Sequence, residues 1–139
     1  MRELFLLGRI LVGGYFLYSG VEQFMRLEAL ARHVAARGIP MPELAVGVSG
    51  LLLLIGGVSL LFGIMPRVGV AALVLFLLPV TLIMHRFWAE TGAARMQDTI
   101  NFGKNVGLLG AILMLAAIPE PWPYSLGTRH RLFRRRLSV

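Results

Sequence analysis

Cysteine is absent from this sequence of 139 residues, and charged residues are few. Without a thiol, the chain forms no disulfide, has no thiolate nucleophile and offers no cysteine ligand to zinc or to an iron–sulfur cluster. Asp, Glu, Lys and Arg together make up only 15% of the chain, with 7 acidic residues against 14 basic ones. We therefore expect no metal ion and no redox cofactor of the chain's own.

Apolar residues dominate instead, at 57% of the chain, and the mean hydropathy is +0.75. A soluble domain of this length leaves too much of its surface in water to hide so many apolar side chains. A membrane helix needs about 20 mostly apolar residues. Four windows approach that length: 4–24, 44–64, 68–84 and 102–118. The sequence therefore predicts one all-α domain, an integral membrane four-helix bundle.

The segments around these windows carry signals of helix starts and ends. Prolines in "RGIPMPE" and "MPR" precede the second and third windows, as expected at the beginning of a helix. The first window resembles a secretory signal, but its long apolar run and the lack of a clean cleavage site favour a retained span. Helical spacing of apolar residues in 25–38 predicts a short helix lying on the bilayer surface, with a lid over a pocket as the alternative.

Basic residues are concentrated after the fourth window, in the segment 119–139. An even number of spans places both termini on one side of the membrane, and Arg2, Arg9 and Arg67 fall on that side with the basic tail. Basic residues favour the cytoplasmic side, so we expect both termini to be cytoplasmic. We expect four tail arginines to contact lipid headgroups rather than nucleic acid: Arg131, Arg134, Arg135 and Arg136.

Polar residues gather at the ends of the windows that lie opposite the termini. The candidates are Tyr18, Glu22, His85, Trp88, Asn101, Lys104 and Asn105. Ionisable groups in a bilayer tend to face protein or a water-filled cavity, which makes them candidates for a functional site. We predict an outward-facing polar pocket in which Lys104 lies opposite Glu22 and near His85. Opposite charges lower the cost of burying each other.

These residues also have structural explanations. Lys104 can extend its ammonium group to the headgroups, and Glu22 can lie in water at the rim. Trp88, close after His85, is typical of an interfacial aromatic belt. The common depth of the three ionisable groups favours a site over these separate explanations.

Glycines recur in the second and fourth windows. Small residues let membrane helices approach closely, so we predict that five of them pack helices together: Gly56, Gly57, Gly103, Gly107 and Gly110. No strand precedes them, which argues against a nucleotide-binding loop. Pro79 predicts a kink in the third span about one turn before His85.

Five motifs in order resemble the DoxX family of small bacterial and archaeal four-helix membrane proteins: "FLYSGVEQF", "GIPMPELA", "LLIGGVSLLFG", "HRFW" and "NFGKNVGLLG". The resemblance covers roughly residues 4–117. It implies an inner-membrane bundle, a link to quinone-reducing or other membrane redox complexes, and a match of His85, Lys104 and Asn105 to recurring polar positions. This chain departs from the family at Gln23, where relatives often have lysine, and at Leu53, where they often have an acidic residue. Both departures favour a structural role over a catalytic one.

Three functions follow as hypotheses. The first is a quinone-linked subunit of a membrane redox complex, which binds quinone and structural lipids and receives electrons from a partner. The second is a non-catalytic accessory subunit that packs against a larger complex or against other copies of itself. A small-solute transporter is disfavoured, because four short spans without paired broken helices leave little room for alternating access.

Overall fold

The computed structural model describes residues 1–127, and these residues form helices and no strand. The elements are α1 (Arg2–Met25), α2 (Leu27–Ala36), α3 (Pro42–Phe62), α4 (Pro66–Pro79), the π-helix η1 (Val80–Met84), the 3₁₀ turn η2 (Phe87–Ala89) and α5 (Gly92–Ala116). The arginines predicted to contact headgroups lie outside the described residues: Arg131, Arg134, Arg135 and Arg136.

Four helical segments of the described chain are long and apolar enough to cross a membrane: Arg2–Met25, Pro42–Phe62, Pro66–Ala89 and Gly92–Ala116. The predicted all-α membrane fold is therefore confirmed. Helix α5 begins at Gly92, which is earlier than the window 102–118 predicted for the fourth span. The stretch 92–101 is polar but contains residues with good helix propensity, such as Ala, Arg, Met and Gln. Hydropathy alone therefore places the start of this helix too late.

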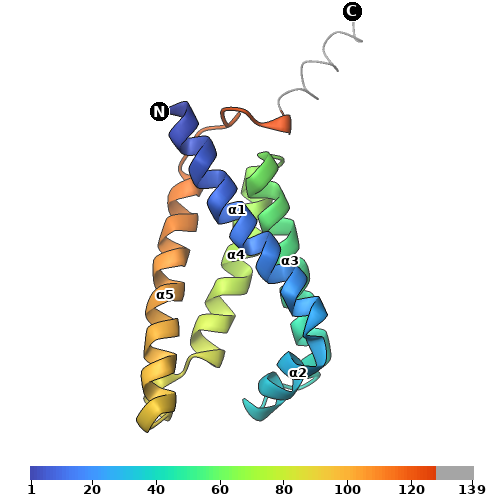
Figure 1. The fold of residues 1–139 in the computed structure, drawn as a ribbon, viewed down its shortest axis with the longest axis vertical. Coiled ribbons are helices and arrows are strands. Elements are labelled where there is room, and N and C mark those ends of the chain that lie inside the picture. The colour runs from blue at the N-terminus through green and yellow to red at the C-terminus, as the bar shows by residue number, and fades with distance from the viewer. Residues whose placement is uncertain (128–139) are drawn as a thin grey trace, which may run out of the picture.

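The four long helices pack in sequence order along an open arc. Helix α1 packs on α3, α3 on α4 and α4 on α5. Figure 1 shows α1 and α5 near each other at the end that holds the N-terminus, and diverging toward the end that holds α2. We call this second end the α2 end. Residues 1 and 127 both lie near the opposite end, as an even number of spans requires.

The short helix predicted within 25–38 is present as α2, which has ten residues. It packs against α3 and buries Ala31. Helix α2 therefore packs over the first residues of α3.

Glycines bring α1 and α3 into backbone contact. A Cβ atom added at Gly57 would lie 2.5 Å from the backbone nitrogen of Leu17, and one at Gly13 would lie 2.6 Å from that of Leu61. Gly56 plays the same part toward α4, where an added Cβ would overlap the side chain of Leu73. The packing predicted for the two glycines of α3 agrees with these contacts. The contribution of α1 was not predicted.

The glycines of α5 behave differently. Nothing in the described chain lies within 4 Å of a Cβ added at Gly103, Gly107 or Gly110. Helix α5 packs on α4, η1 and η2 without close contact at these glycines, so their predicted role in helix packing stays a prediction for contacts outside the described chain. The glycine face of α5 is left open.

Pro79 marks a change of helix type in the third span. Regular α-helix ends at this residue, and the next five residues form the π-helix η1 before the chain leaves helical geometry at His85. Proline lacks the amide hydrogen that an α-helical turn needs, and π-turns often occur at functional positions. The predicted disturbance before His85 therefore takes the form of a wider turn.

The side chain of Arg9, on α1, is buried. Arg9 is one of the basic residues from which the sequence predicts the orientation of the protein in the membrane. Its guanidinium donates to the carbonyl oxygens of Leu60 (3.0 Å), Leu61 (3.1 Å) and Pro123 (2.7 Å). The last carbonyls of a helix have no partner within the helix. Arg9 therefore caps α3 and ties it to the segment after α5, at the end opposite α2.

The two kinds of glycine position predict opposite results for the same substitution. We expect Gly57→Ala to lower the free energy of unfolding by about 1–3 kcal/mol, because its methyl group would overlap the backbone of α1. Gly107→Ala should leave stability unchanged or raise it by up to about 1 kcal/mol, because alanine favours the helix and nothing opposes it. Thermal unfolding of both variants in detergent tests this, and equal shifts would contradict the packing described.

Candidate functional site

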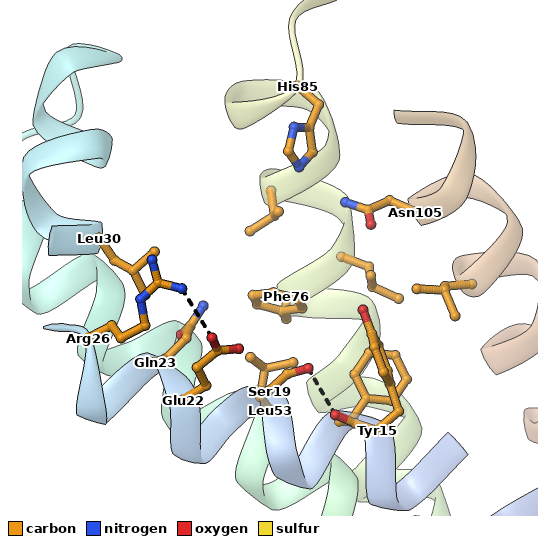
Figure 2. Close-up of a pocket in the computed structure, with 14 residues that line it drawn as sticks. Tyr15, Ser19, Glu22, Gln23, Arg26, Leu30, Leu53, Phe76, His85 and Asn105 are labelled. Carbon is orange, nitrogen blue, oxygen red and sulfur yellow. Dashed lines mark hydrogen bonds and ion pairs between the residues drawn. The ribbon is translucent and has the colours of Figure 1, made fainter. Parts of the chain in front are cut away.

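A cleft of about 250 Å³ lies at the α2 end, where α1 and α5 diverge. Helix α1 forms one wall, α5 the other, and α4 with η1 lies between them. Figure 2 shows the polar side chains that face this cleft from both walls. The polar lining consists of Tyr15, Ser19, Glu22, Gln23, Arg26, His85 and Asn105.

His85 enters the cleft from the end of η1 and is held from behind by a carboxylate. Its Nδ1 lies 3.3 Å from Oδ1 of Asp98, which is buried in α5. Figure 2 shows the ring directed from the end of η1 into the cleft. When Nδ1–H donates to Asp98, Nε2 is an acceptor in the neutral imidazole and a donor in the imidazolium. The geometry therefore gives His85 one nitrogen for exchange of a proton with a bound group.

Asp98 is the most deeply buried member of a largely buried group of charges that joins three segments. Arg37, at the end of α2, donates to Oδ2 of Asp98 at 2.9 Å and to Oε1 of Glu90 at 2.6 Å. Only 13% of the Arg37 side chain and 8% of the Asp98 side chain are exposed. We call Arg37, His85, Glu90 and Asp98 the ion cluster. With a neutral imidazole it carries one net negative charge, and with an imidazolium it is neutral.

Asn105 is a deeply placed polar residue of the cleft whose side chain has no hydrogen-bond partner in the described chain. It is 8% exposed, and no described residue forms a hydrogen bond with its side chain. Figure 2 shows its amide directed into the cleft, toward His85. Its amide atoms remain accessible from the cleft, because Arg86 Nε is the fully enclosed side-chain atom without a hydrogen-bond partner in the described chain. A ligand in the cleft with a hydrogen-bonding oxygen could accept a hydrogen bond from this amide.

The wall formed by α1 adds further hydrogen-bonding groups. Glu22 pairs with Arg26 at 3.1 Å within one helix. Oε1 of Gln23 accepts a hydrogen bond from Ser49 at 2.8 Å, which leaves the NH₂ group of Gln23 as a donor for the cleft. The two walls therefore both present amide donors, from Gln23 and Asn105.

The pairing predicted between Glu22 and Lys104 is wrong. Lys104 is exposed and donates instead to Asn101 at 3.2 Å, and neither of these two residues lines the cleft. Successive residues of an α-helix point about 100° apart. When α5 directs Asn105 into the cleft, it therefore directs Lys104 out of it.

The two aromatic candidates also lie outside the cleft. Tyr18 is 67% exposed and Trp88 is 55% exposed. Trp88 packs edge-to-face on Phe87 and Phe102, at ring-centroid distances of 5.2 and 6.0 Å. This placement agrees with an aromatic anchor at the membrane interface. Of the predicted site residues, the structure brings together Glu22, His85 and Asn105.

Sequence reasoning did not predict the ion cluster around His85. The signal for Asp98 was its position seven residues before Asn105, two helical turns away on the same face. Placing the start of the span at residue 102 hid that spacing. Arg37 and Glu90 lie in segments between spans, and no local pattern connects them to Asp98.

The two departures from the family pattern both line the cleft. Gln23 and Leu53 face it from α1 and α3. At these positions the chain has an amide and an apolar group where relatives often have lysine and an acidic residue. In this chain these two positions therefore present an amide and an apolar side chain to the cleft, and Glu22 pairs with Arg26 at its rim.

Known proteins resemble this chain over most of its length. The DoxX family model matches residues 4–86. Inner membrane protein YphA of Escherichia coli (strain K12) is 32% identical over 126 residues, which cover 91% of this chain and 89% of that protein. No solved structure matches.

Removing the charge of Asp98 should loosen the α2 end. We expect Asp98→Asn to lower the free energy of unfolding by about 3 kcal/mol, because Arg37 stays buried with one carboxylate fewer. The matched control Glu22→Gln removes one carboxylate from a largely exposed pair and should cost less than about 1 kcal/mol. Thermal unfolding in detergent compares the two variants.

A distance measurement gives the same prediction a second readout. The chain has no cysteine, so spin labels at Ala36→Cys and Ala94→Cys report the separation of α2 and α5 alone. We expect Asp98→Asn to broaden this distance distribution and Glu22→Gln to leave it unchanged. Identical distributions in both variants would show that the ion cluster does not hold α5 in place.

Proposed function

The chain belongs to the DoxX family of integral membrane proteins, and from the cleft at the α2 end we propose that it binds the headgroup of a membrane quinone as a subunit of a membrane redox complex. A quinone presents two carbonyl oxygens on a flat ring. Such a ligand needs hydrogen-bond donors on opposite sides and access from the lipid phase. The cleft offers amide donors on its α1 and α5 walls.

The unpaired amide of Asn105 carries this proposal. A polar side chain that is nine-tenths buried normally has a hydrogen-bond partner. The donor of Asn105 faces the cleft together with that of Gln23, and each of them suits one quinone carbonyl. Ligand sites typically combine an apolar lining with a few such convergent polar groups.

The pair formed by His85 and Asp98 supports a role in proton exchange. Reduction of a quinone to a quinol takes up two electrons and two protons. The imidazolium form of His85, stabilised by Asp98, donates one of these protons from Nε2 to one reduced oxygen, and water at the open side of the cleft supplies the second proton. The neutral ring accepts the proton again when the quinol is oxidised. In this proposal a partner protein supplies the electrons.

The proposed orientation follows from charge and from the relative. YphA is named an inner membrane protein, and we propose the same location for this chain. With both termini on the cytoplasmic side, as the basic residues favour, the cleft opens at the outer face of the membrane. Its ligand would then exchange protons with that side.

One observation favours the second candidate function, an accessory subunit. The face of α5 that carries Gly103, Gly107 and Gly110 touches nothing in the described chain. Small residues at this spacing suit close packing against another membrane helix. A partner subunit or a second copy of the chain would bind there, at a face separate from the cleft.

Binding of ubiquinone-1 tests the first candidate. We expect Asn105→Leu to raise its Kd about tenfold, which corresponds to one lost hydrogen bond of about 1.4 kcal/mol. Asn101→Leu is the matched control, because this residue lies one turn earlier on α5 and does not line the cleft. Equilibrium dialysis of the detergent-solubilised protein measures both values. An unsaturable signal, or equal losses in the two variants, would refute quinone binding in the cleft.

Co-purification tests the second candidate. We expect Gly107→Leu to remove a partner, or a second copy, from the protein purified in mild detergent from its native membrane. Gly8→Leu is the control, because nothing lies within 4 Å of a Cβ at that position of α1 either. Ubiquinone-1 binding should stay unchanged in both variants. Retention of every associated protein in Gly107→Leu would exclude α5 as the assembly face.

A further inference from the structure

A second, larger cavity adjoins the cleft on its other side. It measures about 550 Å³ and lies between α2, α3 and the junction of α4 with η1. Its lining is mostly apolar and includes Ile39, Leu44, Val48, Leu52, Leu75 and Ile83. This volume falls within the range of roughly 300–1,000 Å³ that is typical of small-molecule sites.

The two cavities share a wall and meet at His85. Five residues line both of them: Gln23, Leu30, Phe76, Val80 and His85. Two of these five, His85 and Gln23, are the polar groups assigned to the headgroup. A molecule in the cleft therefore has the apolar cavity directly beside its hydrogen-bonding groups.

The apolar cavity also opens to the outside of the bundle. Leu44, Val48 and Leu75, which line it, are exposed on α3 and α4. In a membrane this side faces lipid. Pro79 and the wider π-turn that follows it form the same wall, so the irregular part of the third span borders the opening.

We propose that this cavity holds the long apolar chain of the molecule whose polar head occupies the cleft, and that the chain enters from the lipid between α3 and α4. The inference rests on the proposed function and extends it by assigning a separate site for the chain. An isoprenoid chain of a quinone and an acyl chain of a phospholipid share this chemistry.

Membrane physics determines what such a cavity does. Lipid tails are as apolar as the cavity walls, so a chain gains little free energy by moving from lipid into the protein. The cavity instead gives the polar head access to the cleft. A head attached to a chain reaches Gln23, His85 and Asn105 without drawing the chain through water. Filling the cavity should therefore exclude ligands with long chains and spare those with short ones.

A pair of tryptophan substitutions tests this. Ala45 lines the apolar cavity only, and Ala71 is exposed on α4 and lines no described cavity. In lipid nanodiscs we expect Ala45→Trp to weaken binding of ubiquinone-8 at least tenfold and to change the Kd of ubiquinone-1 less than twofold. Ala71→Trp should change neither. If Ala45→Trp does not fold, Val48→Trp, on the exposed side of the same cavity, carries the test.

The outcomes separate this inference from the proposed function. Equal losses for the two quinones, or no loss for either, would overturn the chain site. If the unmodified protein binds neither quinone, the proposed function fails. Native mass spectrometry with added phosphatidylglycerol then tests whether the apolar cavity binds a lipid chain. Retention of that lipid by the unmodified protein and its loss in Ala45→Trp would support the site with a phospholipid chain. Equal retention in both would overturn it.

Discussion

A largely buried set of charges at the α2 end connects the end of α2 to α5 and to the segment between η1 and α5. Arg37 bonds the carboxylates of Glu90 and Asp98, and Asp98 also holds the ring of His85. Removing such charges from water costs several kcal/mol per ion, so each partner is strongly constrained to remain near the others. On α5 the cluster includes Asp98, one of the three residues that this helix buries. The direction of His85, and with it the chemistry of the cleft, follows from this attachment.

The cleft exists because the bundle is closed at one end and open at the other. Glycines press α1 against α3, and Arg9 ties the end of α3 to the segment after α5. At the α2 end, α1 and α5 have no comparable connection and diverge (Figure 1). The result is a polar cleft next to an apolar cavity that opens toward lipid. An amphipathic molecule with a compact head and a long chain matches this pair of spaces better than a fully soluble one.

The predicted residues that line the cleft and those that do not differ in a physical way. His85 and Asn105 were predicted because polar residues within apolar helices must face protein or water, and both do. The pairing predicted for Lys104 was wrong because it relied on the depth of this residue in the membrane. The prediction did not consider the direction in which the side chain points around the axis of α5. Gln23 was taken as the loss of a reactive group, although the structure makes it a donor in the cleft.

Hydropathy and helical spacing were sufficient to establish the four spans, the short helix between the first two, and the close approach of helices at Gly56 and Gly57. These are local properties, and a bilayer leaves helices as almost the only way for such segments to satisfy their backbone hydrogen bonds. Contacts between residues distant in the chain determine three other features. They determine which face of α5 turns inward, how far α1 diverges from α5, and the pairing of Arg37 with Asp98. Only the folded arrangement decided them, because side-chain packing and charge pairing across helices have no counterpart in the local sequence pattern.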